Sequence, residues 1–353
     1  MNRKTFPFIT IFLTITTLIL ANCNSPRISL VQPTATATQT PPVTPALASG
    51  ASVTPTDTQS AFPTAELGLA ENPLILALPP SANSQAQIDA AKVIASQFTE
   101  RTGYAVVTIV PDSYTALVDS LGKGNAHIVL LDPYAYELAY HMDLVRASYA
   151  VSKEDKGTYG AQFLATRKGG FTSYFDEASG ENTDEAAIAL AQFAGKKPCW
   201  SDEISPSGYV IPLGYLNKNQ IITRPPAFVE GHPTVVRSLY ASGICDFGAT
   251  YIDARKFPSL EDAFPDLIEQ VIVVWQIPAI IPYDVFAFST NMPQAMRDLF
   301  TSLIPAIMQT EAGKAAFKTA YDIDALEPVN DGYYEEFRTY IHASGVDLTT
   351  LIK

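Results

Sequence analysis

From residue 73 onward, the pattern of apolar and polar positions predicts short strands that alternate with helices. Runs that are apolar throughout indicate buried strands, and apolar residues that recur every three or four positions indicate one face of a helix. The first expected elements are a strand at 73–78, a helix at 88–98, a strand at 104–110, a helix at 114–121 and a strand at 128–131. This order is typical of a parallel sheet that is covered by helices on both sides.

The same alternation returns further along the chain and predicts a second sheet. Its expected elements are strands at 196–200, 227–230 and 244–250 and helices at 208–216 and 235–240. The strand-like run 159–167 would cross from one sheet to the other, 271–288 would cross back, and the helical segment 293–353 would pack on the first lobe. We therefore expect an α/β protein with two lobes, each a mostly parallel sheet, and with a cleft at the carboxyl ends of the strands. Lobe 1 would comprise residues 73–162 and 285–353, and lobe 2 residues 163–284.

The first 23 residues have the pattern of an export signal. Arg3 and Lys4 precede an apolar run from Phe6 to Leu20, which is shorter than the roughly 20 residues of a membrane span. The run ends in Leu-Ala-Asn-Cys, which resembles a bacterial lipoprotein cleavage site at which Cys23 would take a lipid. An ordinary signal peptide and an uncleaved anchor are the alternatives. In each case the following residues would lie outside the cytoplasm.

Residues 24–72 are rich in Pro, Thr, Ala and Ser and contain few charges. Such a segment buries too little apolar surface to offset the entropy that is lost on ordering. We expect it to be a disordered, extended tether between the membrane and the lobes.

Charge limits the possible partners. The formal net charge of −13 argues against nucleic acid and against an anionic membrane surface. A small anionic ligand remains compatible with this charge, because salt screens charges that are more than about 8–10 Å away.

The chain contains three cysteines. If Cys23 takes the lipid, Cys199 and Cys245 form an even pair in an oxidising compartment, and each lies beside a predicted strand of the second lobe. We expect them to form a disulfide. Two buried free thiols are the alternative.

Ser205-Pro206-Ser207-Gly208 opens a predicted helix. The first N–H groups of a helix lack partners within the helix, and the positive end of its dipole favours a negative charge. The segment therefore predicts an anion-binding site, and the alternative is that the serines only cap the helix.

The sequence lacks the common signatures of catalysis, and we expect neither an enzyme nor a cofactor. A nucleophile elbow, a phosphate-binding loop, a zinc-protease motif and a dinucleotide fingerprint are all missing. His127, His141 and His342 lack the spacing of metal ligands, so no metal site is expected. We interpret the adjacent acids Asp202-Glu203 and Glu335-Glu336 as solvated surface.

A series of short motifs between residues 73 and 345 resembles the phosphate/phosphite/phosphonate-binding proteins of ABC importers. That family has the type II periplasmic-binding-protein fold. The motifs occur in the order Asp112-Ser113-Tyr114, Asp132-Pro133-Tyr134, Tyr159, Phe193-Ala194-Gly195-Lys196-Lys197, Ser205-Pro206-Ser207-Gly208, Gly231-His232, Gly243 with Asp246 and Gly248, and Ile280-Ile281-Pro282-Tyr283-Asp284.

The resemblance implies roles for residues of the second lobe. Ser205, Ser207 and the amides around Gly208 would bind the oxyanion, and His232 would donate a hydrogen bond to one of its oxygens. Pro206 stands where the family has Thr, which removes one hydroxyl and one N–H from the expected contacts.

The resemblance also implies roles around the hinge. Tyr114 and Tyr159 would close on the ligand, and Asp253 and Asp284 stand where members that bind amino-phosphonates keep two acids for the ligand's ammonium group. Two further tyrosines are expected to pack rather than to bind the ligand: Tyr134 and Tyr136.

Together these features predict a lipid-anchored, monomeric, extracytoplasmic binding protein that passes a phosphonate-, phosphite- or phosphate-like anion to an ABC permease. One alternative is a binding protein for another small organic ion, such as a sulfonate or a thiamine precursor. A different class of function, a sensor or surface-interaction domain with the same fold, is the other alternative.

Overall fold

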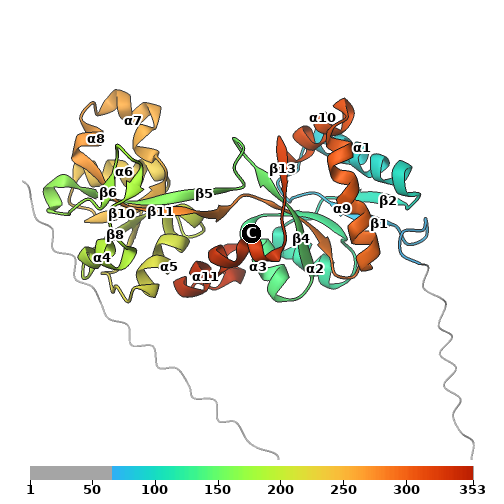
Figure 1. Cartoon of the computed structure of the whole chain (residues 1–353), viewed down its shortest axis with the longest axis horizontal. Coiled ribbons are helices and arrows are strands. Elements are labelled where there is room, and N and C mark those ends of the chain that lie inside the picture. Colours follow the sequence, from blue (N-terminus) through green and yellow to red (C-terminus); the bar gives the residue numbers. More distant parts are fainter. Residues whose placement is uncertain (1–65, 353) are drawn as a thin grey trace, which may run out of the picture. The chain divides into compact units, whose positions relative to one another are not determined.

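Two β-sheets flanked by helices organise residues 66–352, which are the residues that the computed structural model describes (Figure 1). The expected export signal, Cys23 and residues 24–65 of the expected tether lie outside the described residues. The last part of that tether, residues 66–72, packs against the first lobe, where the carbonyl of Gly68 accepts a 2.7 Å hydrogen bond from the Ala105 N–H. Within the described part of the chain, every helix is too short or too polar to cross a bilayer.

The first sheet has six strands in the order β13–β4–β12–β3–β1–β2. They are β1 (Leu74–Ala77), β2 (Val106–Ile109), β3 (Ile128–Leu131), β4 (Val145–Ser152), β12 (Val285–Ser289) and β13 (Ala325–Pro328). Helices α1 (Gln85–Thr102), α9 (Gln294–Met308) and α10 (Glu311–Tyr321) cover one face, and α2 (Tyr114–Gly122) and α3 (Pro133–His141) cover the other. Alternate residues of β3 face opposite sides: Ile128 and Leu130 pack with the first group of helices, and Val129 and Leu131 with the second.

The second sheet has five strands in the order β11–β5–β10–β8–β9. They are β5 (Thr158–Thr166), β8 (Pro198–Trp200), β9 (Ala227–Phe228), β10 (Phe247–Tyr251) and β11 (Val271–Pro282). Around this sheet lie α4 (Ala186–Leu190), α5 (Ile211–Lys218), α6 (His232–Ala241), α7 (Pro258–Ala263), α8 (Leu267–Gln270) and the small hairpin β6 (Phe175–Asp176) and β7 (Glu181–Asn182).

Both sheets are mixed, so the expectation of mostly parallel sheets is wrong. Strands β8, β9 and β10 are parallel, but β5 is antiparallel to β10, with Tyr251 opposite Ala161. In the first sheet, β12 is antiparallel to both β3 and β4. The reason is the connection between the lobes. The parallel strands of the second lobe have their carboxyl ends at the hinge, so β5, which begins at the hinge, must run antiparallel to them.

Two short segments connect the sheets. Residues 153–157 link β4 to β5, and residues 283–284 link β11 to β12. β5 and β11 are paired from the hinge inward, with Thr158 opposite Pro282 and Tyr159 opposite Ile281. This pairing places Tyr283 and Asp284 beside the start of β5, at the carboxyl ends of the parallel strands of the second lobe.

The sequence predicts that the whole C-terminal segment packs on the first lobe, and this prediction is wrong for one helix. Helix α11 (Glu335–Ser344) contacts α5 of the second lobe, where the Tyr340 and Tyr215 rings stack with centroids 3.7 Å apart. Gly214 allows this approach, because a Cβ there would lie 2.1 Å from the carbonyl oxygen of Tyr340.

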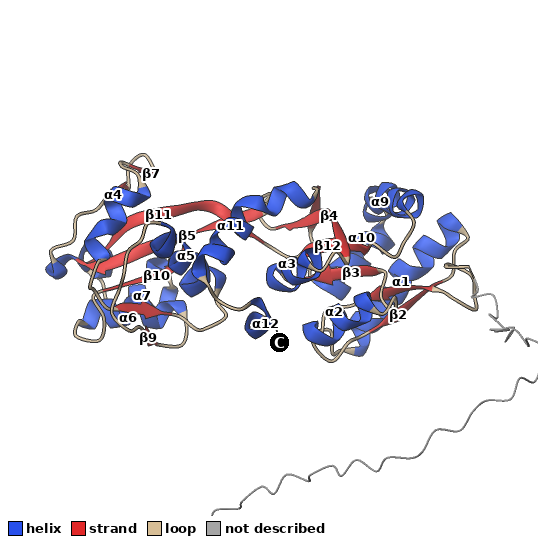
Figure 2. Cartoon of the chain, turned by 90° about the horizontal axis from the view of Figure 1, so that it is seen from below, coloured by secondary structure: helices blue, strands red, loops and turns tan. Residues whose placement is uncertain are grey.

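Helix α11 is also bound to the first lobe. Arg338 Nε lies 2.7 Å from Oε1 of the buried Glu137 on α3, and the short helix α12 (Leu348–Leu351) then packs against α3. Figure 2 shows α11 between α5 and α3. Sequence periodicity cannot reveal this third connection, because the apolar face of α11 looks the same whichever lobe it covers.

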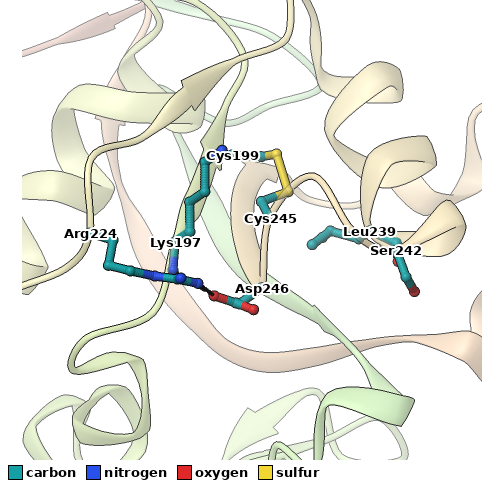
Figure 3. Close-up of a disulfide and its surroundings, with 7 residues drawn as sticks. All are labelled: Lys197, Cys199, Arg224, Leu239, Ser242, Cys245 and Asp246. Carbon is teal, nitrogen blue, oxygen red and sulfur yellow. Dashed lines mark hydrogen bonds and ion pairs between the residues drawn. A yellow bond between two sulfur atoms is a disulfide. The ribbon is translucent and has the colours of Figure 1, made fainter.

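Cys199 and Cys245 form a disulfide with an S–S distance of 2.06 Å, which joins β8 to the segment before β10 (Figure 3). Beside it, a carboxylate oxygen of Asp246 accepts a 2.8 Å hydrogen bond from the Lys197 N–H, and Asp246 also pairs with Arg224. These contacts fasten the two neighbouring parallel strands to each other at their amino ends.

Replacing both cysteines by serine should destabilise the protein without changing its fold. The two residues are 46 positions apart, and closing a loop of this length in the unfolded chain corresponds to about 4 kcal/mol. We expect a loss of this size in the free energy of unfolding, measured by urea denaturation, and a similar loss when the wild type is reduced. Free thiols at both positions in a non-reducing mass spectrum would contradict the disulfide.

Candidate ligand-binding site

The serine-bearing turn lies just beyond the carboxyl end of β8. Residues Pro206–Val210 form a π-helical turn that leads into α5, and Ser205 caps it: its Oγ accepts a 3.0 Å hydrogen bond from the Gly208 N–H. Ser205 and Ser207 are both buried. Ser205 therefore has the capping role that the sequence allows, and its hydroxyl hydrogen remains available to a ligand.

Three elements of the second lobe converge at Gly208. A Cβ at this position would lie 1.9 Å from Ser201 Oγ at the end of β8 and 2.9 Å from Cε1 of His232, the first residue of α6. Gly231 precedes His232 with a φ of 96°, a conformation that favours glycine. The structure thus brings the predicted residues Ser205, Ser207, Gly208 and His232 together.

Two polar atoms at this point are buried without a hydrogen-bond partner among the described residues: Ser201 Oγ and His232 Nδ1. Native structures satisfy nearly all buried polar atoms, so an unpaired pair at one spot indicates a ligand position. Burial lowers the pKa of His232, and Asp202 acts in the opposite direction. A lowered pKa keeps the imidazole neutral at pH 7, with one N–H to donate.

Tyr134 of the first lobe supplies a further buried hydroxyl. It follows Asp132, which caps α3, and its hydroxyl is buried without a partner among the described residues. Burial is the main cause that raises the pKa of Tyr134. The charges of Tyr159, Asp132 and Asp202 raise it further. The charge of Asp202, in the second lobe, thus reaches Tyr134. Tyr134 packs beside Phe337, as expected, and its unpaired hydroxyl adds a candidate donor, whereas Tyr136 donates a 2.6 Å hydrogen bond to Asp331 inside the protein.

Tyr159 and Tyr114 occupy different parts of the hinge region. The Tyr159 ring stacks on Tyr283 with centroids 5.1 Å apart. Burial raises the pKa of Tyr159 to about 12, opposed by a hydrogen bond with Ser207. Tyr114 begins α2, and burial raises its pKa, with further contributions from Asp132 and Asp284. The structure thus places Tyr159 against the serine turn and Tyr114 beside two carboxyl groups.

The two acids that the resemblance assigns to a ligand ammonium group have different surroundings. Asp253 is bound to Arg255 Nη2 and to Gln162 Nε2, both at 2.7 Å. Burial would raise the pKa of Asp253, but the hydrogen bonds and charge of Arg255 outweigh it and lower the pKa. Because its charge is already compensated, Asp253 is unsuited to the expected role.

Asp284 is the less compensated acid. Burial raises its pKa to about 6, the charge of Asp132 adds to this rise, and Lys153 opposes it. Within residues 66–352, no salt bridge reaches its carboxylate. Asp284, Asp132 and Tyr114 therefore form a group in which a proton or a cation would relieve the repulsion between the two acids.

A pocket of about 700 Å³ opens beside the serine turn. It is lined by Ser201, Asp202, Glu203, Ile204, Ser205, Pro206, Phe228, Glu230 and Thr350. Thr350 belongs to α12, so the C-terminal segment forms part of the wall. Asp202 is half-buried here, which corrects its interpretation as solvated surface. A second cavity, of about 540 Å³, lies at the hinge and is lined by Tyr159, Tyr283 and Lys153 among others.

Sequence reasoning missed Ser201, Asp202 and Tyr134 as site residues. Ser201 and Asp202 directly follow β8, and Tyr134 comes three residues after β3. Ligands of open α/β sheets bind beyond the carboxyl ends of strands, and this rule could have selected all three.

Replacing Asp284 by Asn should stabilise the protein at high pH. Because the folded-state pKa of Asp284 is raised, its contribution to stability is complete below about pH 4 and is lost as the pH rises through about 6. The variant should gain on the order of 3 kcal/mol over the wild type at pH 8 and little at pH 4, measured by urea denaturation.

Asp253→Asn is the matched control and should have the opposite effect. Asp253 has a lowered pKa, and its removal leaves the buried Arg255 without its main partner, so stability should fall at pH 8. Equal losses in the two variants at pH 8 would contradict the assignment of Asp284 as an uncompensated acid.

Comparison with known proteins places this architecture in a family. Residues 76–334 match the family described as ABC transporter, phosphonate, periplasmic substrate-binding protein. The phosphate-import protein PhnD of Mycolicibacterium smegmatis is 25% identical over 190 residues, which cover 50% of this chain and 54% of that protein. The chain thus spans about half the length of this relative.

Solved structures resemble the fold. XAC2383 from Xanthomonas citri bound to ATP has a TM-score of 0.55 at 14% identity, over 77% of this chain and 96% of that one. PhnD1 from Prochlorococcus marinus in complex with methylphosphonate has a TM-score of 0.45 at 12% identity, over 76% and 96%. The likeness to XAC2383 shows that the two chains share a fold, which here is an α/β arrangement with two mixed sheets. Since the family match covers well over half of its residues, this chain belongs to the periplasmic substrate-binding proteins of phosphonate ABC transporters.

Proposed function

We propose that this protein, as a monomer, captures a small tetrahedral oxyanion of the phosphonate, phosphite or phosphate class outside the cytoplasm and passes it to an ABC permease. The observation that carries the proposal is the pair of buried, unpaired atoms beside Gly208, Ser201 Oγ and His232 Nδ1. These atoms lie at the amino end of the π-helical turn Pro206–Val210 and at the amino end of α6. Both helix ends favour an anion.

Binding would take place between the two lobes. Ser201, Ser207 and His232 would contact the anion from the second lobe, and Tyr134 and Tyr159 from the first lobe and the hinge. Removing an oxyanion from water is costly, and hydrogen bonds to charged groups contribute about 1.5–3 kcal/mol each, so every ligand oxygen needs donors. Contacts made by both lobes at once are the ones that favour a closed state over an open one.

We also propose that Cys23 carries the lipid that anchors the protein and that residues 24–65 act as its tether. In the native host, the full-length protein should be recovered with the membrane fraction. Cys23→Ser should move it to the fraction that is released without detergent, because the lipid on Cys23 is the main anchor in this proposal. Recovery of both forms with the membrane would favour an uncleaved anchor.

Ser207→Ala and His232→Ala should each weaken ligand binding at least tenfold, because each removes a hydrogen bond to a charged group. Isothermal calorimetry with phosphate, phosphite, methylphosphonate and aminoethylphosphonate, and with sulfate and taurine for comparison, would measure this. A thermal melt of each variant would show that the fold is intact.

Ser344→Ala is a matched control, because this serine is also buried but bonds the Ile341 carbonyl in α11, outside the proposed site. Its affinity should equal that of the wild type. Unchanged affinity in the Ser207 and His232 variants would remove these residues from the site. Absence of binding to all six compounds would favour a sensor or surface-interaction domain instead.

A further inference from the structure

We propose that Asp202 accepts a hydrogen bond from the bound ligand and thereby selects oxyanions that still carry a proton at neutral pH over those that do not. This inference rests on the proposed function and assigns the selectivity of the same site. Phosphate and methylphosphonate keep a P–OH group in part of their population at pH 7. Sulfate and methanesulfonate, which have similar shapes, have no such proton.

The position of Asp202 gives it access to the ligand. It follows Ser201 at the end of β8 and lines the same pocket as Ser201 and Ser205. Its Oδ1 accepts a 3.1 Å hydrogen bond from the Ile204 N–H, which orients the carboxylate. Among the hydrogen bonds and salt bridges of the described residues, none involves Oδ2 of Asp202.

The groups around Asp202 do not neutralise it. Of the described residues that line the pocket, none is Lys or Arg, and the other charged ones are Glu203 and Glu230. The charge of Asp202 raises the pKa of His232 and that of Tyr134. Burial lowers the pKa of the histidine and raises that of the tyrosine, so it favours the neutral form of both. An acidic side chain without a cationic partner thus lies beside the proposed anion-binding site, and this juxtaposition needs a chemical reason.

Two further side chains indicate that a ligand occupies this place. Ser201 is 0% exposed and Tyr134 is 4% exposed, and the hydroxyl of each has no hydrogen-bond partner among residues 66–352. Both can donate to a ligand oxygen, as can His232. Several donors and one carboxylate match the surface of a protonated oxyanion, in which the bare oxygens accept and the remaining O–H donates.

A fully deprotonated oxyanion would fit this arrangement poorly. An ionised carboxylate can only accept hydrogen bonds, so against a bare oxygen it meets like charge and leaves its lone pairs unpaired. Such an unpaired, desolvated contact is an effective way for a site to reject a ligand of the same shape.

The test is the isosteric variant Asp202→Asn in calorimetry at pH 7 with phosphate, sulfate, methylphosphonate and methanesulfonate. The wild type should prefer each phosphorus compound over its sulfur counterpart at least tenfold. Because the Asn amide can donate to a bare oxygen, the variant should reduce both preferences at least tenfold, mainly by improved binding of the sulfur compounds. Asp202→Ser, which also removes the charge and can donate, should show the same reduction.

Glu261→Gln on α7 is the matched control, since it removes the same charge from an exposed residue that does not line the pocket and should leave both preferences unchanged. The proposal is overturned if Asp202→Asn and Asp202→Ser change all four affinities by the same factor, or if the wild type binds sulfate as tightly as phosphate. If the wild type binds none of the four compounds and neither phosphite nor aminoethylphosphonate, the proposed function itself fails, which is distinguishable from a loss of selectivity alone.

Discussion

The antiparallel pairing of β5 with β11 is the constraint on which the site depends. It begins at the hinge, with Thr158 opposite Pro282, and it carries both strands into the second sheet. Because β5 starts where β10 ends, Tyr159 lies at the edge of the sheet at which Ser201, the serine turn and His232 are also found. The short link after β11 then places Asp284 at the same edge. The pairing of these two strands thus brings side chains from distant parts of the chain close together.

At that edge the protein leaves some buried polar atoms unpaired beside others that it satisfies. Asp253 is buried and has Arg255 and Gln162 as partners. By contrast, Ser201, His232 and Tyr134 keep buried polar atoms without partners in the described structure. Leaving such atoms unpaired costs stability, and the cost is offset when a ligand supplies the missing hydrogen bonds.

Helix α11 adds a third connection, which the two hinge segments alone would not provide. It is bound to α5 through the stacked rings of Tyr340 and Tyr215 and to α3 through the pair of Arg338 with Glu137. Any change in the angle between the lobes must therefore shift or repack one of these contacts. Thr350 of the following helix lines the pocket beside the serine turn, so the C-terminal segment forms part of the wall of the candidate site.

Local patterns along the chain determined which segments form strands and helices, because buried strands and one-sided helices have distinct periodicities. The strand at 128–131 was predicted in this way, and the cysteine count predicted the disulfide of the second lobe. The turn at Ser205–Gly208 lies before a helix, as expected, and its role as an anion site stays a prediction. Only the tertiary structure decided the direction of β5, the attachment of α11 to both lobes and the pairing of Asp253 with Arg255. It also decided that the charge of Asp202 reaches Tyr134, although the two residues are far apart in the chain. These outcomes depend on contacts between distant residues, and the alternation of apolar and polar positions carries no information about which distant residues will meet.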